Sequence, residues 1–327
     1  MSRCCLSLVL LTLLLAGCAG QQPAPTTSAL PPPSPSVAPA PSADVVSFTD
    51  DLDRPLRVAP PQRVAALIGS FADVWCVAGG HDTLIATAGD AWTSFDLDLD
   101  DTVADLGAIK EPNLEVLLAA QPDLVLASCN TTANLDLLET LEQAGIQVAY
   151  FDIQTLDDYL RMLEICTRLT GQPERYTQYG TEVQAQAQRA IARQEGQEAP
   201  TVLCLRATGS SCKVKGSVDN VLGEMLSDLG CVNIADGNDT LLESLSLEAI
   251  IAADPDYIFA VLQGSDPTDA QATLESTLLS NPAWGNLRAV QTGQFYTLDH
   301  KLYNLKPNAR WGEAYEKLAD LLYPEES

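Results

Sequence analysis

The sequence predicts an α/β protein built from two similar lobes, on three observations. One 15-residue pattern occurs twice without a gap, as NLEVLLAAQPDLVLA at 113–127 and SLEAIIAADPDYIFA at 246–260. Around each copy, short apolar runs alternate with runs of helical spacing, which indicates a mostly parallel sheet with helices on its faces. Finally, residues 156–195 are mainly helical in pattern and separate the two halves.

Each copy of the repeat predicts the same local structure. Asn113 or Ser246 is a typical helix N-cap, and two helical turns follow it. A Pro-Asp pair then ends the helix and leads into a short apolar strand. A unit repeated once predicts two similar lobes rather than one continuous sheet.

The first lobe is expected to begin near Val45. Its predicted elements, in order, are a strand at 63–68, a helix at 71–77, a strand at 84–87, the first repeat, a helix near 134–144 and a strand at 146–151. From Leu156 the apolar spacing becomes helical as far as Gly171, and a second helical run continues to about Glu195. We interpret this stretch as a connecting backbone.

The second lobe is expected to open with a strand at 201–206. A helix at 218–229, the second repeat, a strand at 294–298 and a loop at 302–306 follow. Pro307 suits the first turn of a final helix, where its missing N–H costs nothing. Trp75 and Trp311 have helical apolar neighbours, so we assign both to the core.

The N-terminus predicts export and a lipid anchor. Arg3, the apolar run 6–16 and the sequence Leu15-Ala-Gly-Cys18 form a secretory signal that is too short to span a bilayer. Its end resembles a bacterial lipobox, in which cleavage exposes a cysteine for lipidation. Residues 18–44 are rich in Pro, Ala, Ser and Thr and read as a tether. We therefore expect a cell-membrane protein, anchored through Cys18 on the extracytoplasmic face.

Composition excludes some function classes. The formal net charge of −26 over 327 residues argues against a nucleic-acid partner, which requires a basic face. The sequence contains no G-x-S-x-G elbow, phosphate loop or H-E-x-x-H motif, and its only histidines are His81 and His300. We therefore expect no enzyme, no catalytic residue, no bound cofactor and no protein-held metal. Disulfide pairing stays open for six cysteines: Cys76, Cys129, Cys166, Cys204, Cys212 and Cys231.

The carboxyl ends of the predicted strands indicate where a ligand binds, because open α/β sheets bind ligands there. Two basic windows follow second-lobe strands and suggest an anion site, although solvated loop charges are an equal alternative. Trp92 and Tyr303 are the aromatic candidates for stacking, with a core position as the alternative. The candidate ligand-binding residues are Ser70, Trp92, Asn130, Arg206, Lys213, Lys215, Lys301 and Tyr303.

Four segments together resemble a known family. They are the two repeat copies, NPAWGNLRAV at 281–290 and KPNARWGEAY at 306–315. With these segments the chain, over residues 58–323, resembles the substrate-binding lipoproteins of ABC importers for iron–siderophores, haem and cobalamin, the class III periplasmic binding proteins. The resemblance implies an α/β fold of two Rossmann-like lobes joined by a single long backbone helix, with the ligand cleft between the lobes. We divide the chain into 1–17 (signal peptide), 18–44 (lipidated Cys and tether), 45–155 (N-terminal lobe), 156–198 (connecting helix) and 199–327 (C-terminal lobe).

The resemblance also implies partners. Glu115 and Glu248 match the glutamates that dock such proteins onto their permease, although each also suits a first helical turn through the helix dipole. An anionic ferric chelate, most simply a ferric siderophore, suits the basic loops. Haem or cobalamin remains an alternative, since His300 and Tyr303 could ligate haem and Trp92 could line a cobalamin cleft. A zinc or manganese binder, a surface-anchored hydrolase and an adhesin are the more distant rivals.

Overall fold

The computed structural model describes residues 45–218, 220–264 and 267–324. The predicted signal peptide (1–17) and the lipidated tether (18–44) lie outside these residues. Within the described part of the chain, no helix has both the length and the apolar character needed to cross a membrane.

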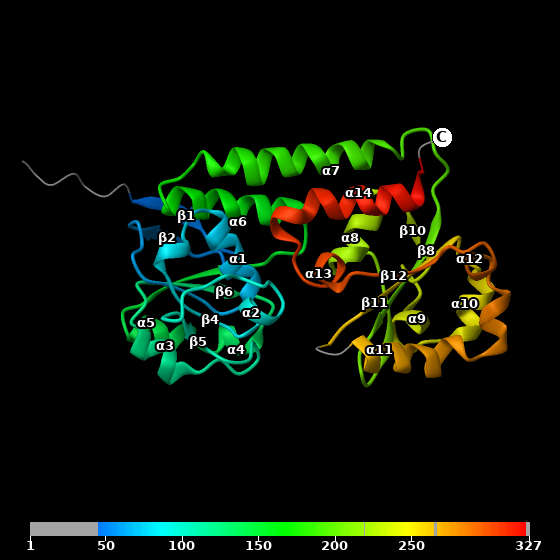
Figure 1. Cartoon of the computed structure of the whole chain (residues 1–327), viewed down its shortest axis with the longest axis horizontal. Coiled ribbons are helices and arrows are strands. Elements are labelled where there is room, and N and C mark those ends of the chain that lie inside the picture. Colours follow the sequence, from blue (N-terminus) through cyan, green and yellow to red (C-terminus); the bar gives the residue numbers. More distant parts are fainter. Residues whose placement is uncertain (1–44, 219, 265–266, 325–327) are drawn as a thin grey trace, which may run out of the picture. The chain divides into compact units, whose positions relative to one another are not determined.

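The N-terminal half forms a five-stranded parallel sheet in the order β5-β4-β3-β6-β7. Figure 1 labels its strands β4, β5 and β6. Its strands are β3 (Val64–Ala66), β4 (Leu84–Thr87), β5 (Ala104–Asp105), β6 (Leu124–Ser128) and β7 (Gln147–Phe151). Its helices are α1 (Gly69–Val77), η1 (His81–Thr83), α2 (Asp90–Thr93), α3 (Leu114–Ala120), α4 (Thr132–Leu135) and α5 (Leu138–Gln143). An antiparallel hairpin, β1 (Val46–Thr49) and β2 (Pro55–Val58), precedes them. We call this half the N-lobe.

The C-terminal half, here the C-lobe, forms a second sheet in the order β10-β8-β11-β12, with β9 antiparallel to β8. Its strands are β8 (Thr201–Ala207), β9 (Cys212–Lys215), β10 (Val232–Asn233), β11 (Tyr257–Leu262) and β12 (Phe295–Leu298). Its helices are α8 (Val221–Asp228), α9 (Asp239–Glu243), α10 (Leu247–Ala253), α11 (Pro267–Leu274), η3 (Glu275–Leu279), η4 (Pro282–Asn286), α12 (Arg288–Gln291), α13 (His300–Tyr303), η5 (Asn308–Arg310) and α14 (Trp311–Leu322).

The two mostly parallel sheets with surrounding helices confirm the predicted α/β class, while some local predictions need correction. The helix expected near 134–144 is divided into α4 and α5, and the segment between the predicted strand at 201–206 and the predicted helix at 218–229 contains the strand β9. The loop expected at 302–306 overlaps α13, and Pro307 caps the short turn η5 that precedes α14. Helical spacing in the second repeat predicts that Ile250 and Ile251 both face the core, but Ile251 is 36% exposed, because it lies about 100° around α10 from the fully buried Ile250.

The connecting segment consists of two helices rather than one. α6 (Leu156–Leu169) ends before Gly171, whose φ of 69° lies in the left-handed region that favours glycine. After this turn the chain continues through the π-helical turn η2 (Thr177–Thr181) into α7 (Glu182–Ala192). α6 shares its core with the N-lobe, whereas α7 packs along α14, where Gln186 Nε2 donates to Glu316 at 2.6 Å. The single backbone helix expected from the resemblance is therefore η2 with α7.

The repeat forms the same structure in both lobes. The Asn113 side chain accepts from Val116 N at 3.1 Å, and the Ser246 hydroxyl accepts from Ala249 N at 3.2 Å, so each helix begins at the predicted cap. Each helix ends in a left-handed residue directly before the proline, with φ of 50° at Gln121 and 42° at Asp254. The predicted caps and stops are confirmed.

The aspartate of each Pro-Asp pair attaches the repeat to the first strand of its own sheet. Asp123 accepts from the backbone nitrogens of Gln62 at 2.9 Å and Arg63 at 3.1 Å, just before β3. Asp256 accepts from the nitrogen and hydroxyl of Thr201, the first residue of β8, at 2.8 and 2.6 Å. Both aspartates thus satisfy backbone donors where a central strand begins.

Side-chain burial agrees with the assignment of tryptophans to the core. Trp75 is 1% exposed and Trp311 is fully buried.

The six cysteines that the structure describes carry free thiols. Burial raises the pKa of the Cys76 and Cys231 thiols to about 12, so both stay protonated at neutral pH.

Asp50 joins the β1–β2 hairpin to the N-lobe sheet. Its buried carboxylate pairs with Arg54 at 2.5 Å and accepts from Tyr150 N at 3.2 Å, and the Arg54 guanidinium lies over the Tyr150 ring. Burial by itself would raise the pKa of the Asp50 carboxyl, but hydrogen bonds from Arg54 and Tyr150 outweigh burial and the pKa falls below its usual 3.8.

We predict that Asp50→Ala lowers the free energy of unfolding by about 3 kcal/mol at neutral pH, because it leaves the buried Tyr150 N–H without its acceptor and removes the nearer of the two carboxylates that pair with Arg54. Since the folded-state pKa is depressed, the contribution of Asp50 is complete above the unfolded-state pKa. It is then lost as the pH falls through the folded-state value. Urea unfolding of wild type and variant between pH 7 and pH 2 measures both effects. Asp136→Ala, at an exposed position, is the control and should cost less than about 0.5 kcal/mol. An equal loss in the two variants contradicts the prediction.

Candidate functional site

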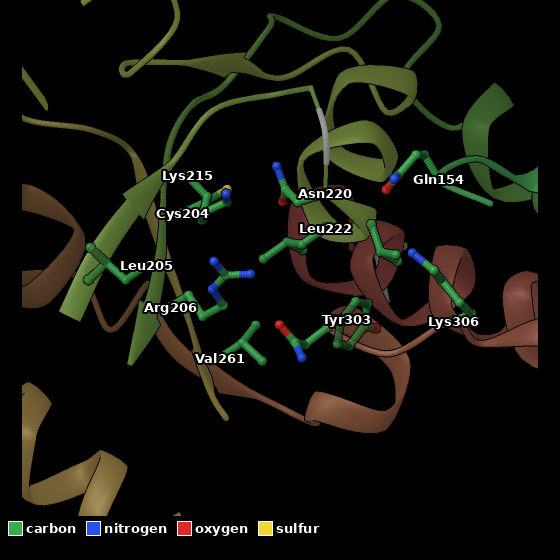
Figure 2. A pocket seen from close by; sticks show the side chains of 12 residues that line it. Gln154, Cys204, Leu205, Arg206, Lys215, Asn220, Leu222, Val261, Tyr303 and Lys306 are labelled. Atoms are coloured by element: carbon green, nitrogen blue, oxygen red, sulfur yellow. The ribbon is translucent and has the colours of Figure 1, made fainter. Parts of the chain in front are cut away.

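A cavity of about 210 Å³ lies against the C-lobe sheet, and we call it the C-lobe cavity (Figure 2). Its polar lining residues are Gln154, Arg206, Lys215, Asn220, Asn304 and Lys306. Gln154 comes from the segment before α6, so residues from both halves of the chain line this space.

The pairing of β8 and β9 explains why several cations occupy one face. Arg206 is opposite Lys213, and Cys204 is opposite Lys215, so these four side chains share one face of the sheet. The alternate residues Leu205 and Val214 are buried in the C-lobe core on the other face.

A second cavity of about 190 Å³, the junction cavity, lies where the N-lobe meets the segment after α13. Its polar residues from the N-lobe are Ser70, Asp90, Ser128, Asn130 and Thr131, and those from the later segment are Asn304 and Lys306. A third space of about 170 Å³ lies beside it and includes Asp73, Asp96, Lys301, Lys306 and Arg310. Drug-sized ligands occupy roughly 300–1,000 Å³. A larger ligand would therefore span more than one of these cavities.

The N-lobe also contains a larger, more apolar pocket of about 820 Å³, formed by the residues after β4, β5 and β6. It shares Asp90, Ile109, Asn130 and Thr131 with the junction cavity. The two spaces therefore have a common wall.

Lys306 is the one residue, of those that the structure describes, that lines the C-lobe cavity, the junction cavity and the third space. Among the described residues, no carboxylate lies within 4.0 Å of its ammonium group, whereas Lys301 pairs with Asp96 at 2.5 Å. Burial lowers the pKa of Lys306, while the charges of Asp152 and Asp158 act in the opposite direction. A partly desolvated cation without a contact ion pair is suited to binding an anion.

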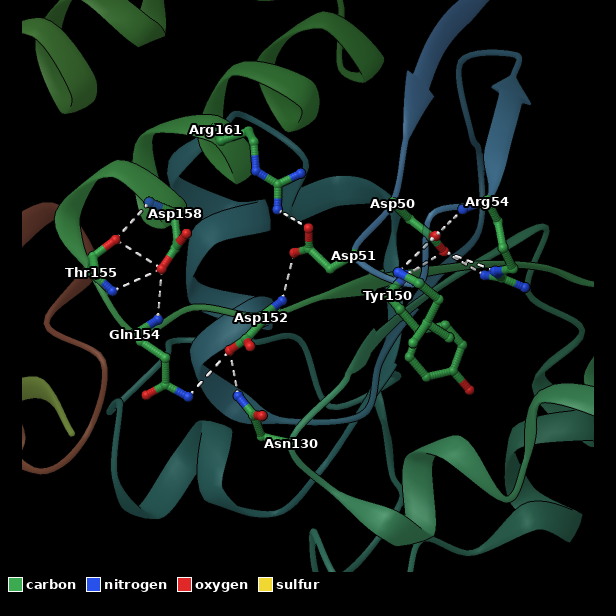
Figure 3. Close-up of polar contacts among 11 residues, drawn as sticks. Asp50, Asp51, Arg54, Asn130, Tyr150, Asp152, Gln154, Thr155, Asp158 and Arg161 are labelled. Atoms are coloured by element: carbon green, nitrogen blue, oxygen red, sulfur yellow. Dashed lines mark hydrogen bonds and ion pairs between the residues drawn. The ribbon is translucent and has the colours of Figure 1, made fainter. Parts of the chain in front are cut away.

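Acidic and amide groups line the N-lobe side of these cavities. Burial raises the pKa of Asp90 to about 6, although its carboxylate accepts from Gly69 N at 2.9 Å. Asp152 accepts from the side-chain amides of Asn130 and Gln154 (Figure 3). Hydrogen-bond acceptors therefore predominate on this side, whereas donors predominate on the C-lobe side.

Asn308 ties the segment after α13 to the N-lobe. Its Nδ2 donates to the Ser70 carbonyl at 2.9 Å and to the Asp73 carboxylate at 2.8 Å, in a fully buried position. Burial raises the pKa of Asp73, and the hydrogen bond from Asn308 counteracts that rise. Asn308 has a φ of 52°, and this region is more accessible to asparagine than to most residues.

The structure places the predicted ligand-binding residues unevenly. Arg206, Lys215 and Tyr303 line the C-lobe cavity, Ser70 and Asn130 line the junction cavity, and Lys301 lines the third space. Lys213 and Trp92 line none of the cavities described above. Lys213 is exposed, and Trp92 packs in part against the N-lobe core.

Tyr303 is positioned by its own lobe. The residue is 5% exposed, and its hydroxyl donates to the Ala314 carbonyl at 3.0 Å. Tyr303 therefore lines the C-lobe cavity as a residue packed in the core, and its stacking role stays a prediction.

The strand-end rule nominated the segments 90–92 and 300–306, which contain Asp90, Asn304 and Lys306, but none of these three was singled out as a ligand-binding residue. Gln154 lay in no nominated segment. The basic window containing Lys301, Lys306 and Arg310 was the available signal for Lys306. Gln154 and Asn304 are uncharged loop residues, and their proximity depends on tertiary structure. No group of three or more His, Cys, Asp or Glu that could hold a metal ion occurs within the described residues.

Glu115 and Glu248 occupy equivalent places in the two lobes. Each is exposed in the first turn of its helix, α3 or α10, next to a buried or half-buried apolar strip. The permease-docking role stays a prediction.

We predict that Asn308→Ala lowers the free energy of unfolding by about 1–3 kcal/mol, because it removes two hydrogen bonds from a buried position, one of them to the Asp73 carboxylate. The control is Asp96→Asn, which breaks an ion pair whose acidic side chain is 72% exposed and should cost less than about 1 kcal/mol. Urea denaturation of both variants provides the comparison. If Asn308→Ala lowers the free energy of unfolding less than Asp96→Asn does, the buried hydrogen bonds of Asn308 contribute less than the exposed ion pair, and the prediction is wrong.

A model of the periplasmic binding protein family matches residues 64–302 of this chain. The chain is 28% identical to a vitamin B12-binding protein of Pectobacterium carotovorum, over 64% of this chain and 73% of that protein. It is 22% identical to a putative ABC transporter substrate-binding lipoprotein of Bacillus subtilis, over 80% of this chain and 83% of that protein. It is also 24% identical to an Fe(3+)-citrate-binding protein of Bacillus subtilis, over 59% of each.

The fold is similar to that of the TroA-like periplasmic binding protein FepB from Veillonella parvula. The TM-score is 0.69 at 18% identity, over 86% of this chain and 90% of that chain. The family match covers most of the chain, including both copies of the repeat and the segment that joins the lobes. The chain therefore belongs to the periplasmic binding protein family.

Proposed function

We propose that this protein is the extracytoplasmic solute-binding protein of an ABC importer, and that it captures an anionic ferric chelate for delivery to the permease. The observation that carries the proposal is Lys306, a partly desolvated cation that lines three adjoining cavities, with Arg206 and Lys215 in one of them. These cations stand out in a chain of net charge −26. The protein would bind and release the ligand without changing it chemically.

The residues around the cavities favour a ferric chelate over the two alternative ligands. For cobalamin, Trp92 was the aromatic candidate, and it lines none of the described cavities. For haem, the Tyr303 hydroxyl is already committed to Ala314, and His300 also lines none of those cavities. The named relatives bind vitamin B12 and Fe(3+)-citrate, so both ligand types enter the test.

We predict that tryptophan-fluorescence titration gives saturable binding of ferric citrate or a ferric siderophore, with weaker or no binding of haem and cyanocobalamin. Lys306→Met removes a charge-assisted contact and should weaken chelate binding about ten- to a hundredfold. Lys317→Met removes an exposed, ion-paired lysine on α14 and should leave affinity unchanged. If no iron chelate binds, or haem or cyanocobalamin binds more tightly, the proposed ligand class is wrong.

The permease interface is proposed to include Glu115 and Glu248. Both are exposed, and each lobe contributes one of them at the same place in its repeat. Two equivalent charges form a two-point contact that suits a partner of two-fold symmetry.

We predict that Glu115→Arg combined with Glu248→Arg abolishes uptake of the labelled chelate while the Kd of the purified protein stays unchanged. Glu164→Arg combined with Glu182→Arg makes the same charge change on exposed positions of α6 and α7 and serves as the control. Normal uptake by the first pair, or equal loss in both pairs, contradicts docking through Glu115 and Glu248.

Cys18 is proposed as the lipidated residue, on the lipobox-like sequence Leu15-Ala-Gly-Cys18 and the tether that follows it. We predict that Cys18→Ala moves the protein from the membrane fraction to the soluble extracytoplasmic fraction, without change in chelate affinity. Cell fractionation and incorporation of labelled fatty acid measure the change. Retention of Cys18→Ala at the membrane would exclude this anchor.

A further inference from the structure

One carboxylate orients two carboxamides on the N-lobe side of the cavities. Asp152 follows β7, and its Oδ1 accepts from Asn130 Nδ2 at 2.5 Å and from Gln154 Nε2 at 3.2 Å (Figure 3). An aspartate carboxylate only accepts hydrogen bonds, so each amide must turn its nitrogen toward Asp152. The carbonyl oxygen of each amide is then the atom left for another partner.

Asp152 is itself held in place. Its backbone nitrogen donates to Asp51 Oδ2 at 2.7 Å, and the same Asp51 carboxylate pairs with Arg161 on α6. The backbone nitrogen of Gln154 donates to Asp158 at 3.0 Å, within the capping box that begins α6. The orientation of both amides is therefore determined before any ligand enters.

The two amides line different cavities, and their oxygens accept no hydrogen bond from the described part of the chain. Gln154 lines the C-lobe cavity, and Asn130 lines the junction cavity. Among the described residues, none donates a hydrogen bond to Asn130 Oδ1 or Gln154 Oε1. The Asp90 carboxylate adds a further acceptor on the wall of the junction cavity.

The donors lie on the other side. Arg206 and Lys215 line the C-lobe cavity together with Gln154, and Lys306 lines both cavities. Arginine and lysine side chains can only donate, so the two sides differ in polarity as well as in charge. A ligand that is anionic over its whole surface would satisfy one side and leave the acceptors of the other unpaired.

We infer that the site selects a chelate with two unlike faces. One face is anionic and contacts Arg206, Lys215 and Lys306, and the other presents N–H or O–H donors, such as secondary amides, to Asn130 and Gln154. Acceptors left unpaired disfavour a ligand that lacks those donors. The inference rests on the proposed function, because it assigns a chemical class to the chelate of that same site.

The test compares two synthetic iron(III) tris-catecholate chelates of equal charge, one with secondary amide arms and one with the same amides N-methylated. Isothermal titration should show that the wild-type protein binds the N–H chelate about tenfold more tightly. Gln154→Met and Asn130→Leu keep a similar side-chain size but remove the acceptor oxygen, so the ratio of the two affinities should fall toward one. Gln143→Met removes an exposed amide bonded to Glu139 on α5 and should leave the ratio unchanged.

Asp152→Asn tests the positioning role separately. An asparagine can donate as well as accept, so the neighbouring amides can turn and present N–H groups instead. The preference for the N–H chelate should fall, while both chelates bind more tightly because a negative charge near Lys306 is gone. A purely structural role for Asp152 would weaken both chelates alike and keep their ratio.

The outcomes separate the two proposals. If neither chelate, nor ferric citrate, binds to the wild-type protein, the proposed function fails. If the chelates bind but the wild-type protein does not distinguish them, the two-faced selection is wrong while the function stands. The same conclusion follows if Gln154→Met and Asn130→Leu leave the preference intact.

Discussion

The buried hydrogen bonds of Asn308 determine where the candidate site lies. Through them the segment after α13 contacts the Ser70 carbonyl and the Asp73 carboxylate of the N-lobe. Lys306 precedes Asn308 by two residues, so the same tie holds its ammonium where three cavities adjoin. Asn308 is fully buried, so its side chain cannot move without losing both hydrogen-bond partners. The site therefore depends on how a C-terminal segment packs against the N-lobe.

The repeat supplies the rigid supports on either side. In both lobes it provides a capped helix, a left-handed stop before proline and an aspartate that holds the first strand of the sheet. Its strands, β6 and β11, then lie next to those first strands, β3 and β8. The residues at the carboxyl ends of these strands include Asn130 after β6 and Val261 in β11, and both line cavities. The two copies of the repeat thus position two cavity walls, one in each lobe, that differ in polarity.

The polarity of the two cavity walls depends on which of their polar groups already form hydrogen bonds within the protein. On the N-lobe side the network of Asp51, Asp152 and Asp158 uses the nitrogen atoms of nearby amides and leaves oxygens available. On the C-lobe side the pairing of β8 with β9 gathers cations on one face, above a core of apolar residues. Hydrogen bonds within the protein thereby determine which groups remain for a ligand.

The sequence by itself determined the elements whose causes are local. Asn113 and Ser246 cap their helices, the Pro-Asp pairs end them, and short apolar runs form the strands, because these effects act over a few residues. The sequence also nominated Ser70, Asn130, Arg206, Lys215, Lys301 and Tyr303, which line the cavities, but only the tertiary structure decided which residues meet there. Lys306, Gln154 and Asn304 meet from segments about 150 residues apart in sequence, and Trp92 and Tyr303 are committed to packing or to internal hydrogen bonds. No periodicity predicts these positions, because burial and hydrogen-bond partners are properties of the folded chain.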